Sequence, residues 1–304
     1  MERADNLQVR IMKELMSPGS FQWNVRQSYA RIAEKLGVDE ETVRNRIARA
    51  QKTGFLGGWR PVLNPHLIGR ESAGIDLEVN DETGKPNAIS QIKLIDGVVF
   101  VLEFHGKGLQ VLLYYENEQD LARKIQLITS ICRSKDPVYW KGGLPPCELN
   151  LKKTDWEIVK ALRRDARRSP SDVGREVGVS TRTVKRRLTL MTNGRAFFVL
   201  LLLDFGKAQG VNCRFIIFGE DENSKNTLDK QVMSRLSVFF SHTTTKNLSV
   251  YSAVFSNLSE AEDALQWIKR LDGVKEARMG IMKEFTLVNE WLDQEIEKRL
   301  AETS

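Results

Sequence analysis

The sequence predicts an α+β protein in which two winged-type helix-turn-helix domains alternate with two ferredoxin-like βαββαβ domains. The main observation is an internal repeat. Residues 28–52 and 169–193 align without a gap at a constant offset of 141, and six of the 25 aligned positions are identical. Each copy is followed by a similar series of strand-like and amphipathic segments. Four domains are therefore expected, with the limits 1–58, 59–148, 149–195 and 196–304.

The second copy has the spacing of a helix-turn-helix motif. Val173 and Val177 lie four residues apart on one helix face, and Gly178 then allows the positive φ that a sharp helix exit often needs. Ser180 is a good N-cap for a second helix, whose inner face carries Val184 and Leu188. Short helices joined at a glycine also occur in other all-helical domains. The first copy repeats the pattern with Ile32, Leu36, Gly37, Val38, Asp39, Val43 and Ile47.

Positive charge is concentrated in the two repeat regions. The formal net charge is +6, made up of +3 for residues 1–54, −2 for 55–150, +8 for 151–195 and −3 for 196–304. Such sorting is typical of an electrostatic footprint for phosphates, although a basic helix face can also be simply solvated. Double-stranded DNA is the partner that this pattern predicts.

Composition indicates a cytoplasmic protein. The three cysteines, Cys132, Cys147 and Cys213, form no CxxC motif, so neither a zinc site nor a disulfide framework is predicted. The N-terminal residues lack the pattern of a signal peptide, and the longest apolar run, 196–203, is far too short to span a bilayer. We therefore expect no membrane partner, no metal and no cofactor.

The first half continues with a linking strand at 54–62 and then a βαββαβ domain. Residues 105–108, His-Gly-Lys-Gly, are expected as a hairpin turn inside this domain. Its strands are predicted at 73–79, 98–104, 109–115 and 137–141, and its helices at 87–95 and 118–132.

The second half repeats this order after a linking strand at 197–203. A further helix at 286–299 has no counterpart in the first half, and Ser259 is the predicted N-cap of the preceding helix. Trp140 and Trp291 look exposed, which favours association between halves or between chains. The strands are predicted at 214–218, 238–240, 249–255 and 274–281, and the other helices at 227–236 and 259–271.

The order of the predicted elements, and several motifs, resemble those of the leucine-responsive regulatory protein/AsnC family of archaeal and bacterial transcription regulators. Residues 151–162 are similar to the opening helix of that family, and 172–180 to its turn. Val184, Arg187 and Leu188 match its recognition-helix pattern. The resemblance implies a sequence-specific DNA-binding regulator whose βαββαβ domains pair. Because two units are fused here, they would pair within the chain as a pseudo-dimer, or between chains as a homodimer.

The helix faces predicted to meet DNA are polar and mostly basic. Arginine in the major groove can hold guanine with two hydrogen bonds. Glu40 and Glu41 at the start of the first recognition helix suit the helix dipole but also repel phosphates, so the second helix is expected to be the stronger reader. The predicted set is Thr42, Arg44, Asn45, Arg46 and Arg49 in the first unit, and Ser180, Thr181, Arg182, Thr183, Lys185, Arg186 and Arg187 in the second.

A basic run, Arg163, Arg164, Arg167 and Arg168, follows the opening helix of the second unit. Asp165 alone cannot pair four cations, so these side chains are expected to contact phosphates and fix position without specifying sequence. The alternative is a solvated helix end whose cations complement the dipole.

The resemblance also implies a small-molecule effector near the βαββαβ hairpins. The corresponding positions are His105, Gly106 and Gly108 in the first half and His242 in the second. Both turns lack the acid usual in the family, which argues against an amino-acid effector. A histidine in a surface turn is the plainer interpretation; a pH- or ligand-sensitive contact is the other.

Two further functions compete with the DNA-binding regulator. The same architecture resembles siroheme decarboxylases, whose pocket for an anionic substrate should contain histidine and arginine. The sequence shows no such cluster in its βαββαβ regions, and no catalytic motif, so we expect no enzyme and no catalytic residue. The second competitor is an architectural chromatin protein with little sequence preference.

Overall fold

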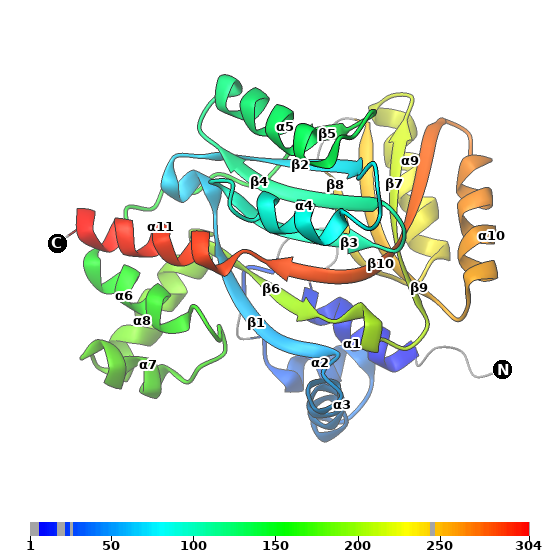
Figure 1. The fold of residues 1–304 in the computed structure, drawn as a ribbon. Helices are drawn as coiled ribbons and strands as arrows, with labels where there is room; N and C mark the ends of the chain where they lie inside the picture. Colours follow the sequence, from blue (N-terminus) through cyan, green and yellow to red (C-terminus); the bar gives the residue numbers. More distant parts are fainter. Residues whose placement is uncertain (1–5, 17–21, 25–26, 244–246, 304) are drawn as a thin grey trace.

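The computed structural model describes residues 6–16, 22–24, 27–243 and 247–303, and it confirms the predicted fold class. Each half opens with three helices, continues through one linking strand and ends in a βαββαβ domain (Figure 1). The opening helices are α1 (Asn6–Met16), α2 (Tyr29–Leu36) and α3 (Glu40–Lys52) in the first half, and α6 (Lys153–Leu162), α7 (Pro170–Val177) and α8 (Thr181–Asn193) in the second.

The predicted turn chemistry of both helix-turn-helix motifs is present. Gly37 and Gly178 adopt φ values of 68° and 75°, so each ends its helix in the left-handed region that a side chain rarely adopts. The Asp39 side chain accepts a hydrogen bond from Thr42 N at 2.6 Å, and Ser180 Oγ accepts one from Thr183 N at 3.1 Å. These caps start the recognition helices where the sequence indicates.

Both βαββαβ domains have the strand order of a ferredoxin-like fold. In the first, the order across the sheet is β5-β2-β4-β3, and in the second it is β10-β7-β9-β8. The first comprises β2 (Glu71–Glu78), α4 (Lys85–Ile92), β3 (Val98–Phe104), β4 (Gly108–Tyr115), α5 (Glu118–Cys132) and β5 (Val138–Lys141). The second comprises β7 (Val211–Gly219), α9 (Glu222–Arg235), β8 (Val238–Thr243), β9 (Leu248–Phe255), α10 (Leu258–Lys269) and β10 (Val274–Leu287).

The two halves are joined by hydrogen-bonded strands. The linking strands β1 (Leu56–Leu63) and β6 (Phe197–Leu203) pair with each other in an antiparallel sheet. Strand β10 is longer than predicted, because its first part pairs with β7 and its residues from Met282 onward pair with β3. One eight-stranded sheet therefore runs through both domains, and short 3-10 helices, η1 (Pro65–Ile68) and η2 (Phe205–Lys207), follow the linking strands.

The two halves of the sheet also face each other. On the outer face of the second half, Phe215 and Tyr251 pack in one apolar cluster with Ala264 of α10. On the inner face, Trp140 of β5 packs with Ile216 and other residues of the second half. Its indole lies against Gly74, where an added Cβ would come within 2.5 Å of the ring. Trp140 is thus buried within the chain, contrary to its expected exposure.

Four helix starts, those of α4, α9, α10 and the C-terminal helix, differ from the predictions, and in α9 and α10 an unpredicted residue caps the helix. Helix α9 begins five residues earlier than predicted, because the Asp221 side chain accepts a hydrogen bond from Ser224 N at 2.8 Å and so caps it. Helix α10 is capped by Asn257 and not by Ser259, with Glu260 N donating to the asparagine oxygen at 2.9 Å.

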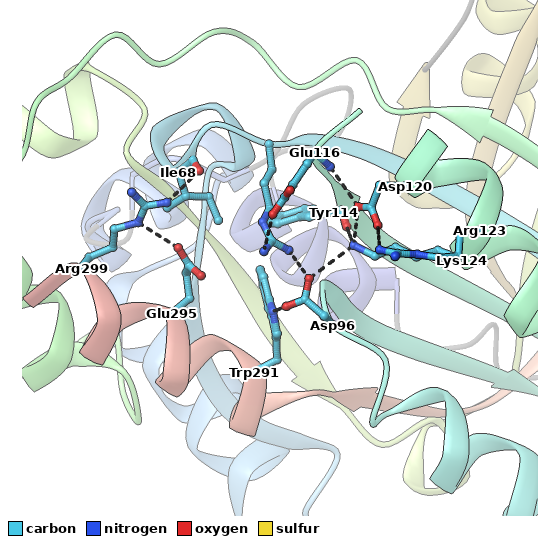
Figure 2. Close-up of polar contacts among 11 residues, drawn as sticks. Ile68, Asp96, Tyr114, Glu116, Asp120, Arg123, Lys124, Trp291, Glu295 and Arg299 are labelled. Atoms are coloured by element: carbon cyan, nitrogen blue, oxygen red, sulfur yellow. Dashed lines mark hydrogen bonds and ion pairs between the residues drawn. The ribbon is translucent and has the colours of Figure 1, made fainter. Parts of the chain in front are cut away.

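Helix α11 (Asn289–Glu302) ties the second helix-turn-helix domain to the first βαββαβ domain (Figure 1). Trp291 is buried; its Nε1 donates to Asp96 Oδ1 at 2.9 Å and its ring meets Tyr114 edge to face (Figure 2). Arg299 Nη2 donates to the carbonyl of Ile68 at 2.8 Å. Trp291 is therefore an internal anchor and not the exposed association surface that the sequence suggested.

The described part of the chain contains no helix with both the length and the apolar character needed to cross a bilayer.

Candidate nucleic-acid interface and inter-sheet cavity

Helix α8 presents a cationic face to solvent. Val184 and Leu188 are buried against the rest of the domain, and Arg182, Lys185 and Arg186 lie exposed on the other side. Within the residues that the structure describes, none of these three cations forms an ion pair with a carboxylate. Thr181 is exposed beside them, while Ser180 and Thr183 hydrogen-bond each other as part of the cap. The cations on this face can donate hydrogen bonds to phosphate oxygens or to base edges.

Arg187 does not share that face. Its guanidinium forms a two-pronged ion pair with Asp155 of α6, and the Asp155 side chain is fully buried. The same carboxylate accepts a hydrogen bond from Lys152 N at 2.9 Å. The hydrogen bonds to Asp155 raise the pKa of Arg187. Arg187 thus makes an internal contact that fixes α8 against α6, and the predicted contact of this residue with DNA stays a prediction.

The basic run pairs with acids other than Asp165, and its predicted contacts with phosphates stay a prediction. Arg164 pairs with Asp293 of α11 at 3.2 Å, and Arg163 reaches Glu297 of the same helix at 3.6 Å. Arg168 pairs with Glu176 at 2.6 Å. These acids lie in α7 and α11, so the local sequence around Asp165 could not reveal them.

Arg167, the remaining cation of the run, bridges the two halves. Its guanidinium lies 4.4 Å from the ring centroid of Tyr29 and 5.4 Å from that of Trp59, and it donates to the carbonyl of Gln27 at 3.3 Å. A guanidinium stacked on aromatic rings stabilises this contact between the halves. Arg167 thus has a structural role whether or not it also meets a phosphate.

The cations of the first recognition helix are arranged differently from those of α8. Arg44 pairs with Glu40 and lies over the Tyr29 ring, while Asn45 is exposed. Arg46 and Arg49 line a cavity beneath α3. The hydroxyl of Thr42 donates to Asp39 at 2.7 Å within the cap. The two recognition helices are therefore not equivalent surfaces.

A second polar site lies between the two halves of the sheet. This inter-sheet cavity has a volume of about 560 Å³ and contains the histidine–arginine cluster that sequence reasoning did not find. Its arginines come from the end of α5, from β7 and from β10, so only the folded chain brings them together. The titratable residues lining it are His105, Lys107, Arg133, Lys135, Arg214 and Arg278, with the acids Asp76, Glu78 and Asp136.

The predicted effector residues fall only partly at this cavity. His105 and Gly108 line it, whereas Gly106 forms the hairpin turn with φ of 70° and is not among its lining residues. His242 lies in β8, and its side chain is outside the described residues.

Burial shifts the pKa of two side chains that line the cavity. Burial lowers the pKa of Arg214 to about 10, and Arg214 Nη1 donates to Gln110 Oε1 at 2.9 Å. Burial raises the pKa of Asp76 to about 7, while Arg278 and Arg214 oppose that rise. A carboxyl whose pKa lies near neutrality, beside several cations, forms an arrangement suited to proton transfer and to anion binding.

The described cysteines and acids suggest neither a nucleophile nor a metal centre. Burial raises the pKa of Cys132 to about 11 and that of Cys213 to about 12, so both thiols stay protonated at neutral pH. Among the described residues, no three histidine, cysteine, aspartate or glutamate side chains lie close enough together to hold a metal ion.

Residues 151–192 match the model of the AsnC-type helix-turn-helix domain, which confirms the predicted resemblance. An uncharacterized HTH-type transcriptional regulator of Pyrococcus horikoshii is 47% identical over 45 residues, which are 14% of this chain and 28% of that protein. The HTH-type transcriptional regulator Ptr1 of Methanocaldococcus jannaschii is 29% identical over 84 residues, or 28% of this chain and 57% of that protein. The matches thus span about a quarter to just over half of these relatives' lengths.

Solved structures match the whole two-unit architecture. The crystal structure of the siroheme decarboxylase NirDL covers 97% of this chain and 98% of its own, with a TM-score of 0.56 and 13% identity. The same enzyme in complex with an iron-uroporphyrin III analogue gives a TM-score of 0.55 at 14% identity. At a sequence identity of 13–14%, this similarity is evidence for a shared fold and for nothing more. An enzyme has this fold along its full length. The architecture therefore does not support the expectation that the chain is not an enzyme, and that expectation is wrong.

Proposed function

We propose that the chain is a DNA-binding transcription regulator that presents α8 to the major groove. The observation that carries the proposal is the exposed face of Arg182, Lys185 and Arg186 on the second helix of an AsnC-type helix-turn-helix domain. The regulators that match parts of the chain support the same function. Arg182 and Arg186 would supply base or phosphate contacts, and Arg187 would hold the helix in position.

The test is binding to duplex DNA, measured by fluorescence anisotropy at several salt concentrations. The variant Arg182→Ala/Arg186→Ala should bind about 10- to 100-fold more weakly, and its salt slope should be shallower by about 0.9 for each phosphate that it no longer neutralises. Arg270→Ala is the matched control, because this exposed arginine follows α10 on the other domain. An equally weakened control would overturn the proposal. Footprinting then separates a regulator, with a discrete protected site, from an architectural protein with uniform coverage.

A second candidate function is an enzyme or sensor that binds an anionic tetrapyrrole in the inter-sheet cavity. The specific observation is the convergence of His105 with Arg133, Arg214 and Arg278 in one cavity. Cations of this kind suit the carboxylates of a uroporphyrin-type ligand, and the likeness to a siroheme decarboxylase gives the idea its substrate class. The site does not involve the exposed face of α8, so the two functions are compatible.

An absorbance titration with iron-uroporphyrin III tests the second candidate. Saturable binding is expected, and Arg278→Gln should weaken it about tenfold, as expected for one charge-assisted contact. The control Arg270→Gln removes a cation that does not line the cavity and should leave binding unchanged. Turnover is sought separately, as loss of carbon dioxide from a bound siroheme. If iron-uroporphyrin III does not bind, this candidate is withdrawn and the DNA-binding proposal is unaffected.

A further inference from the structure

A separate cavity lies beneath the first recognition helix. This α3 cavity has a volume of about 160 Å³ and is lined by residues of α1, α3 and η2 and of strands β6, β7, β8 and β9. Its walls are mainly apolar, with Val9 from α1, Phe55 after α3 and Phe239 from β8 among them. An apolar cavity of roughly 150 Å³ is large enough to hold a single benzene ring. The size therefore limits the apolar part of a ligand to about one ring.

The charged groups in the lining of the α3 cavity are all cations. Arg46, Arg49 and Lys207 supply three cations along its lining. Lys207 also pairs with Asp204 at 2.8 Å, but Asp204 does not line the cavity. In the described part of the chain, no carboxylate is found in the lining. The three cations suit an anion, and the described lining offers no carboxylate to the ammonium group of a zwitterion.

Two buried amides point to an absent acceptor. Asn212 is more than nine-tenths buried, and its Nδ2 has no hydrogen-bond partner among the described residues. Gln8 Nε2 is likewise buried and unsatisfied, and both residues line the α3 cavity. A buried donor without a partner costs free energy, of the order of 1–3 kcal/mol. Both nitrogens have almost no exposed surface, so either amide can donate to a ligand oxygen only after its side chain turns towards the cavity.

We propose that the α3 cavity binds a small carboxylate with an apolar body of about one ring. The carboxylate lies towards Arg49 and Lys207, and the ring lies against Val9, Phe55 and Phe239. The first recognition helix then serves ligand binding through Arg49. Because α1 and α3 both line the cavity, a bound ligand holds the first helix-turn-helix domain against the second βαββαβ domain.

Calorimetric titration of the full chain with phenylacetate, in the absence of DNA, tests this proposal. Phenylacetate should bind one to one, and both the neutral phenylacetamide and the zwitterion phenylalanine should bind about tenfold more weakly, because each lacks the favourable charge match. Arg49→Gln should weaken phenylacetate binding by a similar factor. Arg270→Gln is the matched control, since this exposed cation follows α10 and does not line the α3 cavity.

A second variant keeps the result interpretable. Ala208→Phe adds bulk at a half-exposed position of the cavity wall and should abolish binding while circular dichroism shows a folded chain. The proposal is overturned if phenylacetate does not saturate the protein, if phenylacetamide binds equally well, or if Arg49→Gln leaves the affinity unchanged. None of these results depends on whether α8 binds DNA.

Discussion

Asp76 faces the inter-sheet cavity, and burial raises its pKa to about 7. In the unfolded chain an aspartate ionises near pH 4, so between about pH 4 and 7 only the folded state keeps this proton. The contribution of the protonated Asp76 carboxyl to the free energy of unfolding is complete below pH 4 and is lost as the pH rises to 7. We compare the free energy of unfolding of Asp76→Asn with that of the wild type. The difference should shift in favour of the variant by on the order of 2 kcal/mol between pH 4 and pH 8. Urea unfolding at both pH values measures this, and parallel pH profiles would contradict it.

Arg187 illustrates how a residue of a recognition motif can act internally. Removing its guanidinium leaves the fully buried Asp155 without its charged partner, which typically costs about 3–5 kcal/mol. Arg187→Ala should therefore destabilise the domain strongly, whereas Arg186→Ala, at an exposed position, should change stability by no more than about 0.5 kcal/mol. Thermal unfolding of both variants decides between these roles. Equal melting temperatures would show that the Asp155 pair is energetically unimportant.

At the scale of elements, α11 combines a buried anchor with an exposed electrostatic contact. Trp291→Ala removes an aromatic ring that packs against Tyr114 and bonds Asp96, so we expect a cost of about 3–5 kcal/mol. Asp293→Asn breaks partly exposed pairs with Arg164 and Arg163, which should cost less than about 1 kcal/mol. Chemical denaturation compares the two variants. A larger effect of Asp293→Asn would mean that charge, and not packing, docks the helix.

Local signals in the sequence predicted the elements well. The glycine and cap residues at 178 and 180 fixed one helix-turn-helix, and the helix predicted at 118–132 has the same limits in the structure as α5. What the sequence could not reveal depends on partners far along the chain. The extension of β10 needs the edge of β3, and the acids that hold Arg163 and Arg164 belong to α11. The cluster of His105 with Arg278 likewise exists only after the two halves meet.

At the scale of the whole molecule, the two halves complete each other asymmetrically. Strand β5 has four residues, whereas its counterpart β10 has fourteen and covers the free edge of β3 with its second part. Helix α11 adds a second contact from the C-terminal half onto the first βαββαβ domain. An uncovered strand edge such as that of β3 would be prone to pair with other chains. This asymmetry favours pairing within the chain over pairing of identical halves.

The pseudo-dimer interpretation predicts the behaviour of the separated halves. Residues 1–148 alone would leave the edge of β3 and the linking strand β1 unpaired, so this fragment should aggregate or fail to unfold cooperatively. Co-expression with residues 149–304 should restore a soluble one-to-one complex, because the second fragment supplies β6, the end of β10 and α11. Size-exclusion chromatography with light scattering measures the stoichiometry, and the intact chain is the control. A stable homodimer of residues 1–148 would show instead that each half pairs with its own copy.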